Sequence, residues 1–172
     1  NRALVSTLAA CGDVERNVMC SPAPLDDPTH RKAHELADEI ARKLAPATGA
    51  YYEIWLDGEK VDAQKFDPDD ATEHLNTDSN EEPFYGETYL PRKFKTGIAL
   101  PQDNSIDVYT QDVGLVPVTS NGGDFSKVNV LVGGGLGMTH RKADTFARMG
   151  TPLGSVDVAH AADTVKVVAS IF

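Results

Sequence analysis

The stretch Leu90-Pro-Arg-Lys-Phe-Lys-Thr-Gly-Ile-Ala-Leu100 carries the densest chemical signal in the chain. It predicts a β-strand, in which successive side chains point to opposite faces. The face expected to pack into a core consists of Arg92, Phe94, Thr96, Ile98 and Leu100. The opposite face consists of Lys93, Lys95, Gly97 and Ala99. Because the first face holds the large apolar side chains, the second face is the one expected to be open to a ligand.

The open face combines two cations with a patch that has almost no side chains. A large planar polyanion could lie on Gly97 and Ala99, and a small anion could contact Lys93 and Lys95. The alternative is that both lysines are solvent-facing residues of a half-exposed strand, as surface lysines commonly are. The spacing alone favours this alternative.

The segments around this strand predict further strands and turns. Short apolar segments bounded by Pro, Gly and Asn predict strands at residues 94–100, 106–110, 115–118 and 128–132. Asn121-Gly122 predicts a hairpin turn between the last two. Upstream, the aromatic and β-branched segment 51–56 predicts a fifth strand, which ends in a turn at Asp57-Gly58.

Helices are predicted on both sides of this strand set. The best-supported helix begins at Pro28 with Asp27 as its N-cap, and Glu39 and Lys43 are spaced for an exposed ion pair. Its apolar stripe consists of Ala33, Leu36, Ala37, Ile40, Ala41 and Leu44. Further helices are predicted over residues 3–11, part of 141–149, and 155–172. About five strands flanked by helices indicate the α+β class.

Length and composition limit the class of protein. The 172 residues are 41% apolar, which indicates a single globular domain over 1–172 with a real core. No membrane span is expected, because no run of roughly 18 apolar residues occurs, and no secretory signal is visible. With a net charge of −10 the chain is a poor candidate for nucleic-acid binding. Residues 66–83 carry seven acidic side chains and no Lys or Arg, which predicts a solvated loop.

Cysteine and histidine spacing predicts no metal site. Cys11 and Cys20 match no common zinc or iron–sulfur pattern, and we expect both to be reduced, as in a cytoplasmic or plastid-stroma protein. His30 and His34 stand one helical turn apart, but no carboxylate or cysteine is placed in the sequence to complete a metal site. We therefore expect surface histidines.

Two other segments could bind an anion. Arg16 lies in the predicted loop 13–28, where the alternative is a local ion pair with Asp13 or Glu15. The stretch Val132-Gly-Gly-Gly-Leu-Gly137 permits close backbone approach to a ligand, or it is simply a tight turn. It does not meet the dinucleotide-binding fingerprint, because His140 stands where the last glycine is needed.

Taken together, the motifs resemble the assimilatory sulfite and nitrite reductase hemoproteins. The resemblance rests on four segments in the right order, of which the second is specific to the family: Thr7 to Val14 continuing through Arg16-Asn-Val-Met19, Tyr89-Leu-Pro-Arg-Lys-Phe-Lys95, Asp103-Asn-Ser-Ile-Asp107, and Val132 to Gly137. It covers essentially the whole chain. The resemblance implies the first of two siroheme-binding halves, an α+β domain with a mixed sheet, present as a fragment.

The resemblance also implies chemistry and site residues. The family reduces sulfite to sulfide by six electrons at a siroheme coupled to a 4Fe-4S cluster, in sulfur assimilation. Arg16, Lys93 and Lys95 would form most of the anion site. The residues that would contact the cofactor are Arg92, Asn17, Gly133, Gly134 and Gly135. The implied electron donor is ferredoxin or an NADPH-dependent flavoprotein.

Departures from the family pattern limit these expectations. The cluster cysteines match nothing in this chain, so we expect them in the remaining domains of a parent hemoprotein and expect this fragment alone to be inactive. Glu15 stands where the family more often has Asn, and His140-Arg-Lys142 replaces a common His-Gly-Asn. Two alternatives stay open: a nitrite reductase, which Lys95 disfavours because those enzymes usually have Asn there, and a non-catalytic anion- or nucleotide-binding module.

Overall fold

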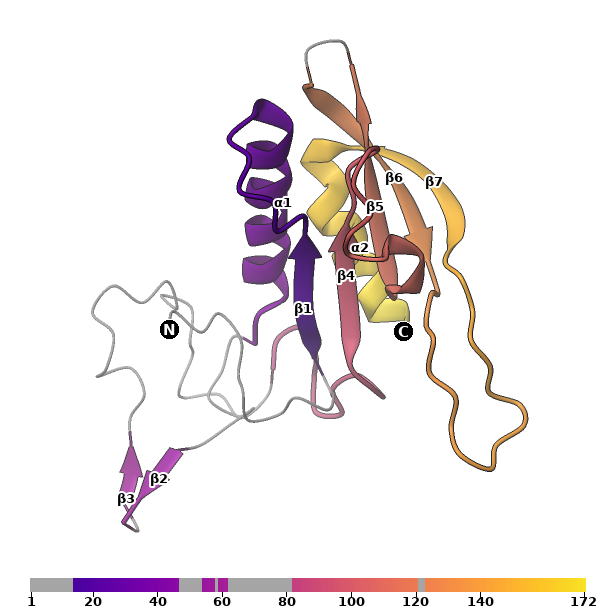
Figure 1. Ribbon diagram of the computed structural model, residues 1–172. Helices are drawn as coiled ribbons and strands as arrows, with labels where there is room; N and C mark the ends of the chain where they lie inside the picture. Colours follow the sequence, from indigo (N-terminus) through magenta and orange to yellow (C-terminus); the bar gives the residue numbers. More distant parts are fainter. Residues whose placement is uncertain (1–13, 47–53, 58, 62–81, 121–122) are drawn as a thin grey trace.

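A five-stranded mixed sheet forms the centre of the computed structural model, which describes residues 14–46, 54–57, 59–61, 82–120 and 123–172 (Figure 1). In spatial order its strands are β1 (Glu15–Cys20), β4 (Phe94–Ile98), β5 (Val113–Thr119), β6 (Phe125–Val132) and β7 (Thr151–Asp157). The first three are parallel, whereas β6 and β7 run antiparallel to their neighbours. The predicted α+β class is therefore confirmed.

Two helices cover one face of the sheet, α1 (Pro28–Leu44) beside β1 and α2 (Ala161–Ile171) behind the central strands (Figure 1). The prediction for α1 is confirmed: the Asp27 side chain accepts a hydrogen bond from His30 N at 3.0 Å, and Pro28 occupies the first turn. Lys43, however, pairs with Asp163 of α2 rather than with Glu39. This ion pair joins the two helices.

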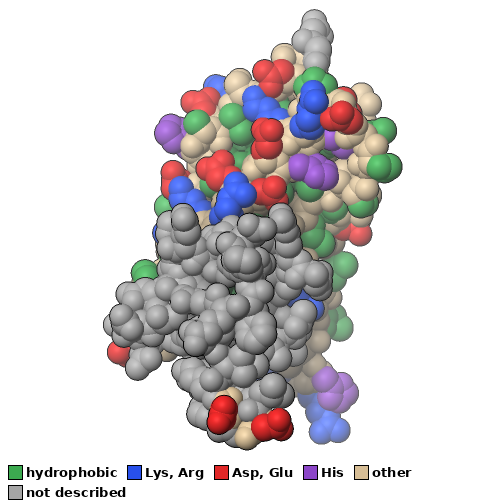
Figure 2. Space-filling model, turned by 90° about the vertical axis from the view of Figure 1, so that its left-hand side faces the viewer, with side chains coloured by type: hydrophobic (Ala, Val, Ile, Leu, Met, Phe, Trp, Pro, Cys, Tyr) green, Lys and Arg blue, Asp and Glu red, His purple; other side chains and the backbone are tan. Residues whose placement is uncertain are grey.

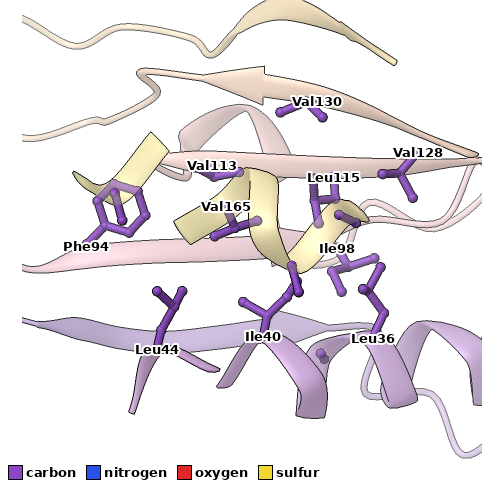
Figure 3. Close-up of a cluster of buried hydrophobic side chains, with 14 of the residues drawn as sticks. Leu36, Ile40, Leu44, Phe94, Ile98, Val113, Leu115, Val128, Val130 and Val165 are labelled. Carbon is purple, nitrogen blue, oxygen red and sulfur yellow. The ribbon is translucent and has the colours of Figure 1, made fainter. Parts of the chain in front are cut away.

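The core lies between the helices and the sheet, and Figure 3 shows that its side chains come from α1, from α2 and from the strands. Phe94 and Ile98 point into it from β4, as predicted for the apolar face of that strand. The other labelled members are Leu36, Ile40, Leu44, Val113, Leu115, Val128, Val130 and Val165. Burying each side chain of this size contributes about 1.5–3 kcal/mol, so this cluster fixes the position of β4.

On the solvent side of α1, acidic and basic side chains are interspersed (Figure 2). The exposed positions of the helix include Glu35, Asp38, Glu39 and Arg42. No single sign of charge dominates this face, so it is not the place where an anion would collect.

Two of the five sheet strands differ from those predicted. The predicted loop over 13–28 is wrong for Glu15–Cys20, which form β1. Its polar residues hide the period-2 pattern, and the strand exists because β4 supplies its hydrogen-bond partners. The predicted helix over 155–172 begins only at Ala161, since its first residues belong to β7. Pro152 and Gly154 made β7 hard to predict from the sequence, because both residues are unusual inside a strand and are tolerated here at an exposed edge.

Two other predicted elements are also wrong. Residues 106–110 form turns and the 3₁₀-helix η3 (Val108–Thr110), because this segment must cross between the parallel strands β4 and β5; Asn104 Oδ1 accepts the Val108 N–H at 2.8 Å. No part of 141–149 is helical, so the helix predicted there is wrong. The segment belongs to an excursion from Gly133 to Gly150, where Arg141 has a positive φ of 64° and Gly135 pairs with Arg148.

The remaining predictions concern the sequence before β4 and the hairpin after β5. The predicted turn at Asp57 is confirmed between β2 (Ile54–Leu56) and β3 (Glu59–Val61). Several predictions lie outside the described residues: the helix at 3–11, the first half of the strand at 51–56, the turn at Asn121-Gly122 and nearly all of the acidic loop 66–83. A second 3₁₀-helix, η4 (Val158–His160), precedes α2. In the part of the chain that the structure describes, no helix is long and apolar enough to cross a membrane.

Candidate functional site

The predicted site residues lie at one edge of the sheet, where β1, β4 and β5 begin and β6 ends (the lower end in Figure 1). Because β6 is antiparallel to β5, Val132 at its end is the register partner of Val113. The glycine stretch after β6 therefore reaches the same edge as Arg16 and Lys95. We call the side chains of Arg16, Arg92, Lys93 and Lys95 the cationic edge.

A β-bulge sets the position of Arg16. The register partners are Glu15 with Phe94 and Asn17 with Lys95, so Arg16 is an extra residue without a partner. An unbulged strand would put Arg16 opposite the buried Phe94. The bulge puts Glu15 there instead and leaves Arg16 free of the core, as bulges beside binding sites commonly do. Asn17 Oδ1 is buried, and no described group donates a hydrogen bond to it.

Asp112, directly before β5, holds two of the cations together. Its carboxylate, 4% exposed, pairs with Arg92 Nη2 and with Lys95 Nζ, the latter at 2.7 Å. It also accepts the Lys95 N–H at 3.0 Å. Arg92 lies over the Phe172 ring at 5.3 Å as well. Lys93 is half-buried and forms no ion pair with any described residue. Sequence reasoning missed Asp112, whose one signal is a carboxylate just before a buried strand.

Glu15 is a second buried carboxyl group that sequence reasoning did not place in the site. Its Oε1 accepts the Thr96 N–H at 3.0 Å and its Oε2 forms a hydrogen bond with the Thr96 hydroxyl at 3.2 Å. Burial raises the pKa of Glu15 to about 8, against the lowering effect of the Thr96 hydrogen bonds. Glu15 is therefore mostly uncharged at neutral pH.

The glycines after β6 are packed against the backbone of residues 109–112. Gly134 N donates to Gln111 O at 3.1 Å, and a Cβ added to Gly134 would lie 2.6 Å from that oxygen and closer still to Tyr109 O. Gly133 has a φ of +75°, which favours glycine. The close backbone approach therefore takes place within the protein at Gly133 and Gly134.

Beyond these contacts the glycines line an open cavity of about 470 Å³ between Arg92 and the 133–150 excursion. Gly133, Gly134 and Gly135 line it, with Arg148 as a second cation and Phe146 as an aromatic wall. The structure thus brings Arg92 together with the glycines predicted to contact the cofactor. Arg92 also connects the cavity to the cationic edge, because it shares Asp112 with Lys95. Sequence reasoning missed Arg148, which is brought here by its pairing with Gly135.

The flat patch predicted on β4 is not open to a ligand. Gly97 and Ala99 are buried, because the connection from β4 to β5 crosses this face. A Cβ added to Gly97 would lie 2.7 Å from Ile106 Cδ1 and 2.8 Å from Gln111 Cγ. Only the first part of the face, with Lys93 and Lys95, can take part in an anion site.

Among the described residues, no group of histidine, cysteine and carboxylate side chains is placed to hold a metal ion. His30 Nδ1 contacts Asp27 Oδ2 at 2.6 Å, whereas His34 Nε2 contacts Ser21 O at 3.2 Å. His30 is only 12% exposed, which corrects the expectation of a surface histidine. Cys20 is a free thiol, and Cys11 lies outside the described residues. A second cavity of about 420 Å³, at the opposite end of the sheet, is lined by no Lys or Arg among the described residues and does not suit an anion.

Comparison with known proteins finds a family and several relatives. The family model described as "Nitrite and sulphite reductase 4Fe-4S domain" matches residues 36–172. A Synechococcus elongatus protein named sulfite reductase [ferredoxin] is 50% identical over 161 residues, covering 91% of this chain and 26% of the relative. A Staphylococcus saprophyticus protein named sulfite reductase [NADPH] hemoprotein beta-component is 48% identical over 157 residues, covering 91% of this chain and 25% of the relative. The chain spans about a quarter of the length of these relatives.

Among solved structures, the Mycobacterium tuberculosis NirA protein matches with a TM-score of 0.54 at 20% identity, covering 95% of this chain and 22% of that protein. At this level of identity the likeness concerns the fold. It agrees with the α+β class and the mixed sheet described above.

Proposed function

The chain belongs to the family of nitrite and sulphite reductase 4Fe-4S domains, and from that premise we propose that it is one siroheme-binding domain of a sulfite reductase hemoprotein, called the parent protein below. The observation that carries the proposal is the cationic edge next to the glycine-lined cavity, linked through Arg92 and Asp112. In a chain of net charge −10, four cations at one edge are a local exception.

The residues present suit a planar polycarboxylate. Arg92 and Arg148 line the cavity and would pair with carboxylates of siroheme. Gly135 leaves room for a flat ring, because a Cβ added there would meet only the Arg92 guanidinium, at 4.0 Å. When bound, siroheme working with a 4Fe-4S cluster supplies the electrons for the six-electron reduction of sulfite to sulfide. The cluster ligands are expected outside this chain.

Three cations would bind the sulfite anion. Lys93 and Lys95 would donate hydrogen bonds from Nζ to sulfite oxygens and hold protons for the oxygens that leave, while Arg16 would neutralise charge. Asp112 supports this role because it fixes the direction of Lys95. Asp112 offsets part of the positive charge of the four cations, and an uncharged Glu15 offsets none of it.

The partners follow from the same assignment. The names of the two relatives support ferredoxin or an NADPH-dependent flavoprotein as electron donor. The remaining domains of the parent protein would complete the cofactor site, and we propose that this chain alone reduces nothing.

The test is the cofactor content of the parent protein produced together with siroheme synthesis. We expect siroheme absorption to co-purify and to fall in the Arg92→Ala and Arg148→Ala variants, but not in Arg42→Ala on the exposed face of α1. A parent protein that carries no siroheme would overturn the proposal and favour an anion- or nucleotide-binding module.

A further inference from the structure

Glu15 occupies a position in which a carboxyl group is unexpected. It is the register partner of the buried Phe94 and is itself only 8% exposed. Both its main chain and its side chain are held: Glu15 N donates to the Tyr85 hydroxyl at 3.0 Å, and that hydroxyl donates to Leu44 O. Glu15 Oε1 accepts the Thr96 N–H, and Oε2 forms a hydrogen bond with the Thr96 hydroxyl, to which the protonated carboxyl group donates. The residue therefore clamps the start of β1 to β4 and to the end of α1.

This clamp is directly next to the bulge that carries Arg16. In β4 the Lys95 N–H donates a hydrogen bond to the Asp112 carboxylate, and the next N–H, that of Thr96, donates one to the Glu15 carboxyl group. Two carboxyl groups thus stand on either side of the Lys95–Thr96 peptide. Asp112 is paired with two cations, whereas Glu15 is held by neutral groups.

We propose that Glu15 is a positioning residue of the anion site: its buried carboxyl group, held against Thr96 in β4, fixes the bulge that presents Arg16, and a negative charge on it weakens anion binding. This inference rests on the proposed function. When Glu15 is uncharged, the cations interact with Asp112 and with the bound anion. When Glu15 is ionised, it adds a second negative charge beside the cations and competes with the anion. The titratable and charged groups around Glu15 are Asp112, which opposes its ionisation, Lys95, which favours it, and the Tyr85 hydroxyl.

The test compares sulfite affinity at pH 7 and pH 9 in the parent protein and in the Glu15→Gln and Glu15→Ala variants. Calorimetry with sulfite measures the affinity whether or not siroheme is bound. Gln keeps the shape and cannot ionise. We therefore expect wild-type affinity at pH 7 and about tenfold tighter binding than wild type at pH 9, because one nearby negative charge is removed. Glu15→Ala should weaken binding at both pH values, because the clamp is lost.

The control is Glu35→Gln on the exposed face of α1, which should follow wild type at both pH values. The titration of sulfite itself affects all variants equally, so it cancels when the affinity of each variant is divided by that of wild type at the same pH. Equal losses of affinity between pH 7 and pH 9 in wild type and Glu15→Gln would overturn the inference. Absence of siroheme from the parent protein would overturn the proposed function separately, while the calorimetric ratio still decides the role of Glu15.

Discussion

Replacing Gly134 with Ala tests how the glycine stretch supports the site. The added Cβ would lie 2.6 Å from Gln111 O and closer still to Tyr109 O, inside the 3.0 Å that Cβ atoms keep from other atoms. Both atoms belong to the backbone and cannot rotate away. The change must therefore displace the segment 109–112, which carries Asp112.

Three backbone hydrogen bonds would be strained by this displacement. They join Gly134 N to Gln111 O at 3.1 Å, Gly133 N to Asp112 O at 2.9 Å, and Gly150 N to Tyr109 O at 2.8 Å. Overpacking costs about 1–3 kcal/mol. Because rigid backbone receives the clash, we expect the upper end, about 3 kcal/mol, in the free energy of unfolding.

Urea unfolding followed by circular dichroism measures this loss. The matched control is Gly137→Ala, since nothing lies within 4 Å of its added Cβ and its φ is not positive. The control should stay within about 0.5 kcal/mol of wild type. Equal unfolding midpoints for the two variants would refute the packing of Gly134 against residues 109–112.

Three further predictions concern the charged groups. Lys93→Ala or Lys95→Ala in the parent protein should each lower sulfite turnover about ten- to a hundredfold, because a charge-assisted contact is lost. Lys127→Ala, on the exposed part of β6, should leave turnover unchanged. Unchanged steady-state rates in both lysine variants would show that the cationic edge is not the anion site. Asp112→Asn should lower the free energy of unfolding by about 1.5–3 kcal/mol, because a buried acceptor of two cations is lost; an unchanged urea midpoint would contradict this. The folded chain holds the Glu15 proton up to pH about 8, against an ordinary pKa of 4.5. Stability should therefore fall by about 1.4 kcal/mol per pH unit between these values, and urea midpoints at pH 5 and pH 8 should differ less in Glu15→Gln than in wild type.

The sequence predicted the elements whose signals are local. α1 has its cap, its proline and its apolar stripe within one segment, and β4 has its two large apolar residues, Phe94 and Ile98, on one face. β1 and β7 were missed because their stability comes from pairing with β4 and β6 and not from their own pattern. The covering of Gly97 likewise depends on the path from β4 to β5.

The cations that the motifs indicated do lie at one edge of the sheet, but the carboxylate with which two of them pair could not be predicted. Asp112 and Arg148 reach Arg92 and Gly135 through strand register, which no local pattern encodes. The burial of Glu15 depends on a one-residue bulge. The motifs therefore indicated the cations, and only the fold shows which carboxyl groups oppose them.

The specificity of the parent protein distinguishes a sulfite site from a nitrite site. Steady-state kcat/KM should be measured for sulfite and for nitrite on the siroheme-loaded protein with one electron donor. We predict a preference for sulfite, because Lys95 adds a second lysine beside Lys93 at the cationic edge. A preference for nitrite by orders of magnitude would contradict it.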